Sequence, residues 1–236
     1  MQLSSLTGES KKMLVTRYTN INEPAFSPLA FSKKYDLQKV LKADSVFEIN
    51  SQTPFTLTTA GTYFFRAGND TTDGITIFVA DKRFPRFTQA KDLLKPVIYI
   101  SSNDEIREAN TAKEPKRTLD RYWLRLAGGN EDAAKRNVKL YYRRVTQANL
   151  LFTTYKEGWK TDLGMVFIVF GPPDKINRLK DRQIWTYKDV PNFQEVNFTF
   201  VKRPNQLAEN NYELLRYAEY DQAWTPLVEA WRNGGN

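Results

Sequence analysis

The sequence predicts an α+β protein, with an N-terminal antiparallel β-sandwich-like domain followed by a domain in which two helices pack on an antiparallel β-sheet. Three observations predict this class. Short β-branched and aromatic runs recur between residues 45 and 79, apolar residues recur at helical spacing between 117 and 155, and apolar strand-like runs begin at 165. The predicted divisions are 1–90 (β domain), 91–116 (linker and strand) and 117–236 (α+β domain).

The N-terminal domain is predicted from five short runs that are rich in β-branched and aromatic residues. Turn-forming residues separate these runs, including Gln52-Thr53-Pro54 and Ala60-Gly61. Strands that recur every roughly 8–12 residues with such turns between them are typical of antiparallel sandwiches. The predicted strands cover residues 14–18, 46–49, 55–58, 62–66 and 75–79.

Between the two domains, Pro85 and Pro96 mark a segment with several large apolar residues. This composition indicates a linker that packs on one domain or on both. The β-branched run at 97–100 predicts one more strand, and the polar segment at 101–116 predicts a loop.

Two amphipathic helices are predicted next. Residues 117–127 carry apolar side chains at i, i+3, i+4 and i+7, and Gly128-Gly129 ends the helix. Asn130, followed by two acidic residues, is a suitable N-cap for a second and longer helix. The apolar face of that helix comprises Ala134, Val138, Tyr141, Val145, Ala148, Phe152 and Tyr155.

Three apolar runs after the helices predict the second sheet, at residues 165–170, 183–188 and 196–201. The first run is apolar at nearly every position, so we expect both of its faces to be covered. Residues 211–217 fit either a strand or a helix, and residues 224–231 predict a short terminal helix.

Composition excludes several kinds of chemistry. The chain of 236 residues contains no Cys and no His, which excludes disulfides, Cys or His metal ligands, Ser-His-Asp triads and thiol nucleophiles. We therefore predict no catalytic residue, no metal site and no cofactor. The formal net charge is +8, but the basic residues are scattered, which favours solvated surfaces over nucleic-acid binding.

The sequence predicts no transmembrane helix, because its apolar runs are far shorter than the ~20 residues that span a bilayer. The start of the chain is polar and lacks the apolar region of a signal peptide. If the protein is exported, we expect this sequence to be the mature part or a fragment of a longer chain.

The stretch from Gly158 to Gly164, GWKTDLG, lies between the long helix and the first apolar run. Gly158 is expected to be the C′ residue of the helix in the left-handed conformation, with Trp159 packing back as an apolar seal. Thr161 and Asp162 fit a side-chain-stabilised turn, and Gly164 would let the backbone enter a strand. The alternative is that this stretch is an exposed ligand site.

A second turn, Gly171-Pro172-Pro173-Asp174, follows the apolar run. Its prolines cannot donate to a ladder, so they are expected to end a strand. A rigid Pro-Pro corner beside Trp185 and Tyr187 is also a candidate docking ledge. The candidate docking residues are Trp159, Thr161, Asp162, Pro172, Pro173, Asp174, Trp185 and Tyr187, and the candidate structural residues are Gly158, Trp159, Thr161, Asp162, Gly164 and Gly171.

These residues carry a resemblance to a known family. The run GWKTD at 158–162, the run VFGPPDKI at 169–176 and the run IWTY at 184–187 resemble the GWxTD domain of Bacteroidota and related bacteria. The resemblance implies a periplasmic or outer-membrane-associated envelope protein, often a lipoprotein, that is held by a lipid anchor or by a partner. It implies no catalytic residues.

The leading hypothesis is a non-enzymatic scaffold or protein-interaction subunit of a bacterial envelope complex, with other envelope or outer-membrane proteins as partners. Surplus aromatic residues favour protein docking. The alternative is a carbohydrate-active or hydrolytic module in which two carboxylates act as acid and base. Its candidate carboxylates are Asp162, Asp174, Asp181 and Glu195. A basic nucleic-acid binder is a third hypothesis.

Overall fold

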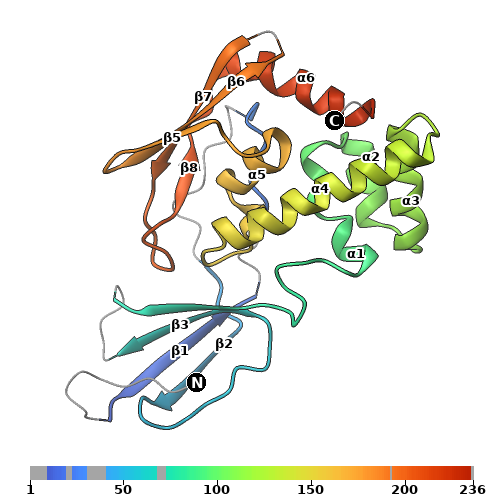
Figure 1. Cartoon of the computed structure of the whole chain (residues 1–236). Coiled ribbons are helices and arrows are strands. Elements are labelled where there is room, and N and C mark those ends of the chain that lie inside the picture. Colours follow the sequence, from blue (N-terminus) through green and yellow to red (C-terminus); the bar gives the residue numbers. More distant parts are fainter. Residues whose placement is uncertain (1–9, 20–22, 31–40, 68–72, 192, 235–236) are drawn as a thin grey trace.

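The computed structural model describes residues 10–19, 23–30, 41–67, 73–191 and 193–234. It contains two antiparallel four-stranded sheets, with most of the helices between them in sequence (Figure 1). This arrangement confirms the predicted α+β class. We call the two sheets the N-terminal sheet (β1–β4) and the C-terminal sheet (β5–β8).

The N-terminal sheet has the order β2-β1-β3-β4. Its strands are β1 (Lys12–Tyr18), β2 (Ser45–Asn50), β3 (Gly61–Ala67) and β4 (Ile75–Val79). Four of the five predicted N-terminal strands are therefore confirmed. The predicted strand at 55–58 is wrong: this segment pairs with no strand and instead lays Phe55 and Leu57 over the apolar face of the sheet, where the Phe55 and Phe65 rings lie 5.6 Å apart.

The linker is helical where the sequence predicted a strand and a loop. Its elements are α1 (Ala90–Leu93), the 3₁₀ helix η1 (Pro96–Tyr99) and α2 (Asn103–Asn110). Pro96 at the start of η1 supplies a helical φ and needs no hydrogen-bond partner for its nitrogen. Ser102 and Glu105 form a capping box at the start of α2. These two residues are the sequence signal that the loop prediction missed.

The two amphipathic helices are confirmed as α3 (Pro115–Leu126) and α4 (Glu131–Phe152). Asn130 caps α4 by accepting a hydrogen bond from the amide of Ala133 at 2.9 Å. The two helices pack through aromatic side chains, and the Trp123 and Tyr141 rings lie 5.3 Å apart. In Figure 1, α4 crosses the molecule from the helical part toward the C-terminal sheet.

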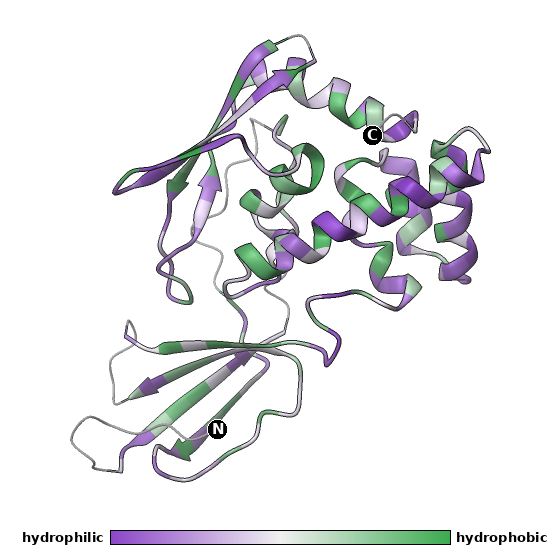
Figure 2. Ribbon diagram, in the orientation of Figure 1, coloured by the Kyte–Doolittle hydropathy of each residue, from purple (hydrophilic) through white to green (hydrophobic). Residues whose placement is uncertain are grey.

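The apolar run at 165–170 is a helix, and its prediction as a strand is wrong. It forms α5 (Asp162–Phe170), in which eight of the nine residues are buried. A run that is apolar on all sides carries no period, so it fits a buried helix as well as a buried strand. Figure 2 shows this hydrophobic segment in the middle of the molecule.

The C-terminal end of α5 is closed by a half-buried cation. Arg144 on α4 donates hydrogen bonds to the carbonyls of Ile168 and Val169 at 3.1 and 2.8 Å, and it lies 5.1 Å from the Trp231 ring. Burial lowers the pKa of Arg144. A cation at this position interacts favourably with the helix dipole and satisfies carbonyls that the helix leaves open. Gly171, at φ 89°, then ends α5, so the turn at 171–174 ends a helix rather than the predicted strand.

The C-terminal sheet has the order β5-β6-β7-β8. Its strands are β5 (Lys175–Arg178), β6 (Arg182–Val190), β7 (Phe193–Lys202) and β8 (Tyr212–Leu214), followed by η3 (Ala218–Tyr220) and α6 (Asp221–Arg232). The predicted strands at 183–188 and 196–201 and the terminal helix are confirmed. Helices α5 and α6 cover the sheet: Phe170 contacts Phe198 and Trp224, with ring centroids 4.8 and 5.7 Å apart.

The N-terminal sheet contacts the rest of the chain through a small apolar cluster. Tyr18 and Phe64 from the sheet pack with Leu207, Leu41 and Tyr155. The Thr62 hydroxyl also donates to the carbonyl of Tyr155 at 2.5 Å. The chain just after α4 is thus tied to the sheet. Within the described residues, no helix combines the length and the apolar character needed to cross a membrane.

Candidate functional site

The GWKTD stretch forms a compact turn between α4 and α5. Residues Gly158–Lys160 are the 3₁₀ helix η2, Thr161 is the N-cap of α5, and Asp162 is its first residue. We call residues 158–162 the motif turn. Residues 23–30, which we call the strap, pass beside it: the amide of Ala25 donates to the carbonyl of Lys160 at 3.0 Å.

Gly158 is required by a close backbone approach. A Cβ at this position would lie 1.9 Å from the carbonyl oxygen of Ala148 on α4. Gly164 repeats the arrangement, because its Cβ would lie 1.9 Å from the carbonyl oxygen of Gly158. The expected left-handed C′ role of Gly158 is wrong, since α4 ends at Phe152 and Gly158 has no positive φ. Gly164 lies within α5 rather than at the start of a strand.

Trp159 is only 1% exposed. Its ring lies edge-on to Phe87 and Tyr99, at 6.4 and 6.2 Å. Its backbone is fixed on both sides: the amide donates to the Asn149 side chain at 3.0 Å, and the carbonyl accepts from the Tyr99 hydroxyl at 2.8 Å. The indole nitrogen donates to Glu157 at 3.2 Å. Trp159 therefore joins the linker, α4 and the motif turn.

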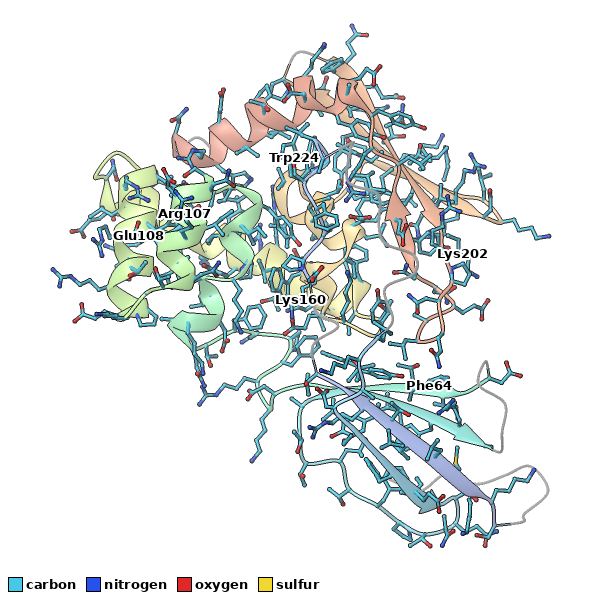
Figure 3. All side chains as sticks on the ribbon, turned by 180° about the vertical axis from the view of Figure 1, so that it is seen from behind. Phe64, Arg107, Glu108, Lys160, Lys202 and Trp224 are labelled. Carbon is cyan, nitrogen blue, oxygen red and sulfur yellow. The ribbon has the colours of Figure 1, made fainter. Side chains whose placement is uncertain are left out.

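Lys160 lies at the junction between the helical part and the N-terminal sheet (Figure 3). Its ammonium group pairs with Glu157 and lies 5.4 Å from the centroid of the Trp159 ring. Trp159 and Lys160 also form part of the wall of a cavity of about 370 Å³. The remaining wall is mostly apolar and includes Leu94, Val97 and Ile106.

Thr161 satisfies two backbone groups at the start of α5. Its hydroxyl donates to the carbonyl of Gly158 at 2.7 Å and accepts from the amide of Gly164 at 3.0 Å. This is the arrangement of a helix N-cap combined with a tight turn. Thr161 is buried, so its polar group serves the turn itself.

Asp162 is 3% exposed and forms a buried ion pair. One carboxylate oxygen accepts from the Arg216 guanidinium at 2.8 Å, and the other accepts from the amide of Leu214 at 2.8 Å. Arg216 also donates to the carbonyls of Phe26 and Ser27, at 2.9 and 3.2 Å. The pair therefore connects α5, the end of β8 and the strap.

Other ionisable groups lie near this pair. Burial raises the pKa of Glu213, and the negative charge of Asp162 raises it further. Burial lowers the pKa of Lys156, and the Lys160 cation also lowers it against the opposing attraction of Asp162. Both shifts disfavour a charge on these two side chains. Asp162 and Arg216 instead form an ion pair, with a guanidinium nitrogen 2.8 Å from a carboxylate oxygen. At this separation the attraction between the two charges is strong in the low dielectric of the interior.

The structure divides the eight predicted docking residues between the interior and the surface. Trp159, Thr161, Asp162, Trp185 and Tyr187 are buried, Pro173 is half-buried, and Pro172 and Asp174 are exposed. The Tyr187 hydroxyl donates to the carbonyl of Gly171 at 2.9 Å, and Asp174 accepts from the amide of Lys188 at 2.8 Å. The predicted set therefore does not lie on one surface.

The four candidate carboxylates for hydrolysis each bind a different partner. Asp162 binds Arg216, Asp174 binds the Lys188 amide, Asp181 binds Arg182, and Glu195 accepts from the Asn197 amide. In the part of the chain that the structure describes, no group of three or more acidic side chains is placed to hold a metal ion.

Three residues of the site were missed from the sequence: Tyr99, Asn149 and Arg216. Asn149 carries a usable signal, because it is a polar residue that lies beside Ala148 and four residues after Val145, on the predicted apolar side of the helix. Its side chain bridges the amide of Trp159 and the carbonyl of Pro85, both at 3.0 Å. Tyr99 and Arg216 carry no such signal, because their partners lie 60 and 54 residues away in sequence.

These observations define a class of domain, in which a short Gly-Trp turn joins a long amphipathic helix to a buried helix and an antiparallel sheet. The model of the GWxTD domain matches residues 61–233, and the chain belongs to this family. The match begins at Gly61, so it includes β3 and β4 of the N-terminal sheet. No curated protein and no solved structure gives a significant match.

We expect Gly158→Ala to lower the free energy of unfolding by about 3 kcal/mol or more, because the added methyl group overlaps the backbone of α4. Urea unfolding measures this loss. Gly128→Ala is the matched control: it has a φ of +59° but no atom within 4 Å of the added Cβ, so a cost of about 1–2 kcal/mol is expected. Equal costs at the two sites would contradict the close approach.

We expect Asp162→Asn to cost about 3–5 kcal/mol, because it leaves the buried Arg216 cation without its counter-charge. Urea unfolding of the parent protein, Asp162→Asn, Arg216→Met and the double variant gives a double-mutant cycle. The two losses should be strongly non-additive, with a coupling energy of about 1–3 kcal/mol. Additive losses would show that the two side chains do not act as a pair.

Proposed function

We propose that this protein is a non-catalytic scaffold or protein-interaction subunit of a bacterial envelope complex. The observation that carries the proposal is that the polar groups of the family motif bind to other groups of the same fold. Both carboxylate oxygens of Asp162 bind within the fold, the Thr161 hydroxyl binds within its own turn, and Trp159 is buried. A motif whose polar groups bind internally supports architecture rather than chemistry.

The envelope location is part of the same proposal, and membership of the GWxTD family supports it. We place the protein on the periplasmic side of the outer membrane, held there by a lipid anchor or by partner proteins. Its partners would be other envelope or outer-membrane proteins, and its interaction surfaces would be outside the motif turn.

The hydrolytic alternative has less support. A retaining or inverting glycosidase needs two carboxyl groups that face each other across a cleft, at about 5–10 Å. The four candidate carboxylates are instead engaged with separate partners: an arginine for Asp162 and Asp181, a backbone amide for Asp174 and a side-chain amide for Glu195.

Affinity purification of the full-length protein from its native membranes tests the proposal. We expect envelope proteins to co-purify in stoichiometric amounts and to remain bound after gel filtration. The same tag on an unrelated protein of the same membranes is the control.

Two results would overturn the proposed function. One is a protein that elutes without partners after gentle solubilisation. The other is a purified protein that turns over a glycan or a peptide and loses that activity on a single Asp or Glu substitution.

A further inference from the structure

One face of α4 points to solvent along most of the helix. Its residues recur every three or four positions, and at 3.6 residues per turn they fall within a sector of about 120° that is about 22 Å long. We call this surface the α4 stripe. It consists of Arg136, Lys139, Arg143, Gln147, Leu150 and Leu151, all of which are exposed.

The first half of the α4 stripe is cationic. Within the described residues, Arg136, Lys139 and Arg143 form no ion pair, whereas Lys135 on the neighbouring side of the helix pairs with Glu131 and Asp132. All three side chains are exposed, so their charges face solvent. They form a positive surface that complements a row of carboxylates.

The second half of the stripe is apolar. Leu150 and Leu151 are 65% and 63% exposed, the highest values among the large apolar side chains that are exposed in the described residues. They are not surplus core residues, because the opposite side of the same turns already packs inward through Ala148 and Phe152. The Phe152 ring lies 5.4 Å from Trp185. Two adjacent exposed leucines on a rigid helix supply an apolar anchor point.

We propose that the α4 stripe docks an acidic amphipathic helix of a partner protein. The leucine end receives apolar side chains of the partner, and the cationic end faces its carboxylates. A partner helix of about 15 residues matches the length of the stripe. This inference rests on the proposed function as an interaction subunit, and it assigns the surface and the chemistry of one partner.

The composition of the stripe favours a protein helix over a lipid surface. A helix that lies on a membrane buries a broad apolar face in the headgroup region. The broad apolar face of α4 is directed into the core of the protein, and its exposed side offers only two leucines at one end. The cations occupy the same sector as the leucines instead of flanking a wider apolar face.

The test is site-specific photocrosslinking in the full-length protein in its native cells. p-Benzoylphenylalanine replaces Gln147, which lies between the charges and the leucines. The control places the same probe at Leu179, which is 55% exposed in the turn between β5 and β6. We expect a crosslink at 147 and none to the same protein at 179. The crosslinked peptide, identified by mass spectrometry, should be acidic, with apolar residues at helical spacing.

A charge-reversed variant tests the electrostatic half of the proposal. Arg136→Glu, Lys139→Glu and Arg143→Glu together should lower the crosslink yield at least tenfold. The melting temperature of this variant should stay close to that of the parent protein, because all three side chains are exposed. An unchanged yield would overturn the proposal, as would a crosslinked peptide that is basic or lacks helical spacing.

A vesicle-binding experiment distinguishes a lipid surface from a protein helix as the partner of the α4 stripe. Purified protein is mixed with vesicles of phosphatidylglycerol and phosphatidylcholine, and binding that requires both the three cations and the two leucines would overturn the protein-helix proposal.

If partners co-purify but none crosslinks at 147, this inference fails and the proposed function stands. If no partner co-purifies at all, the proposed function fails as well.

Discussion

The contact between the backbone at Gly158 and the carbonyl of Ala148 determines how closely the motif turn packs on α4, and therefore where α5 begins. A side chain at position 158 would occupy the place of that carbonyl, so glycine is the residue that lets the chain cross α4 at this distance. One residue later, Trp159 enters the space between Phe87 and Tyr99. Because Thr161 caps α5 immediately afterwards, the same crossing sets the position of α5, on which the C-terminal sheet packs.

The buried Asp162–Arg216 pair adds connectivity to this packing. Burying two charges has a large desolvation cost, so such a pair is weak evidence for added stability. Its effect on the arrangement of the chain is stronger. The guanidinium binds strap carbonyls as well as Asp162, and Asp162 binds the amide of Leu214. Segments that are remote in sequence therefore bind the same ion pair. Displacement of the strap or of the end of β8 would remove a hydrogen bond to a buried charged group.

Local sequence patterns explain which parts of the fold could be predicted. Strands β1–β4, β6 and β7 were found from β-branched, aromatic or apolar runs, and helices α3 and α4 were found from apolar residues at helical spacing. Most of helix α5 is apolar on all sides and has no period, so the run at 165–170 fitted a strand equally well. The sequence analysis interpreted Thr161 and Asp162 as a turn, whereas in the structure they begin the helix. The site was likewise predictable only where a local pattern indicates it. The sequence suggested that Trp159 packs inward, but the reason for Gly158 is a tertiary contact that no local pattern reports.

The motif turn is part of the core, where α4, the linker and β8 hold it through hydrogen bonds. Amide hydrogen exchange measures this directly at Trp159, whose amide binds Asn149, and at Leu214, whose amide binds Asp162. We predict that both amides exchange only through global unfolding, with the same free energy as the buried amide of Ile168 in α5. Exchange of Trp159 and Leu214 through a local opening, about 2 kcal/mol or more below the global value, would contradict it.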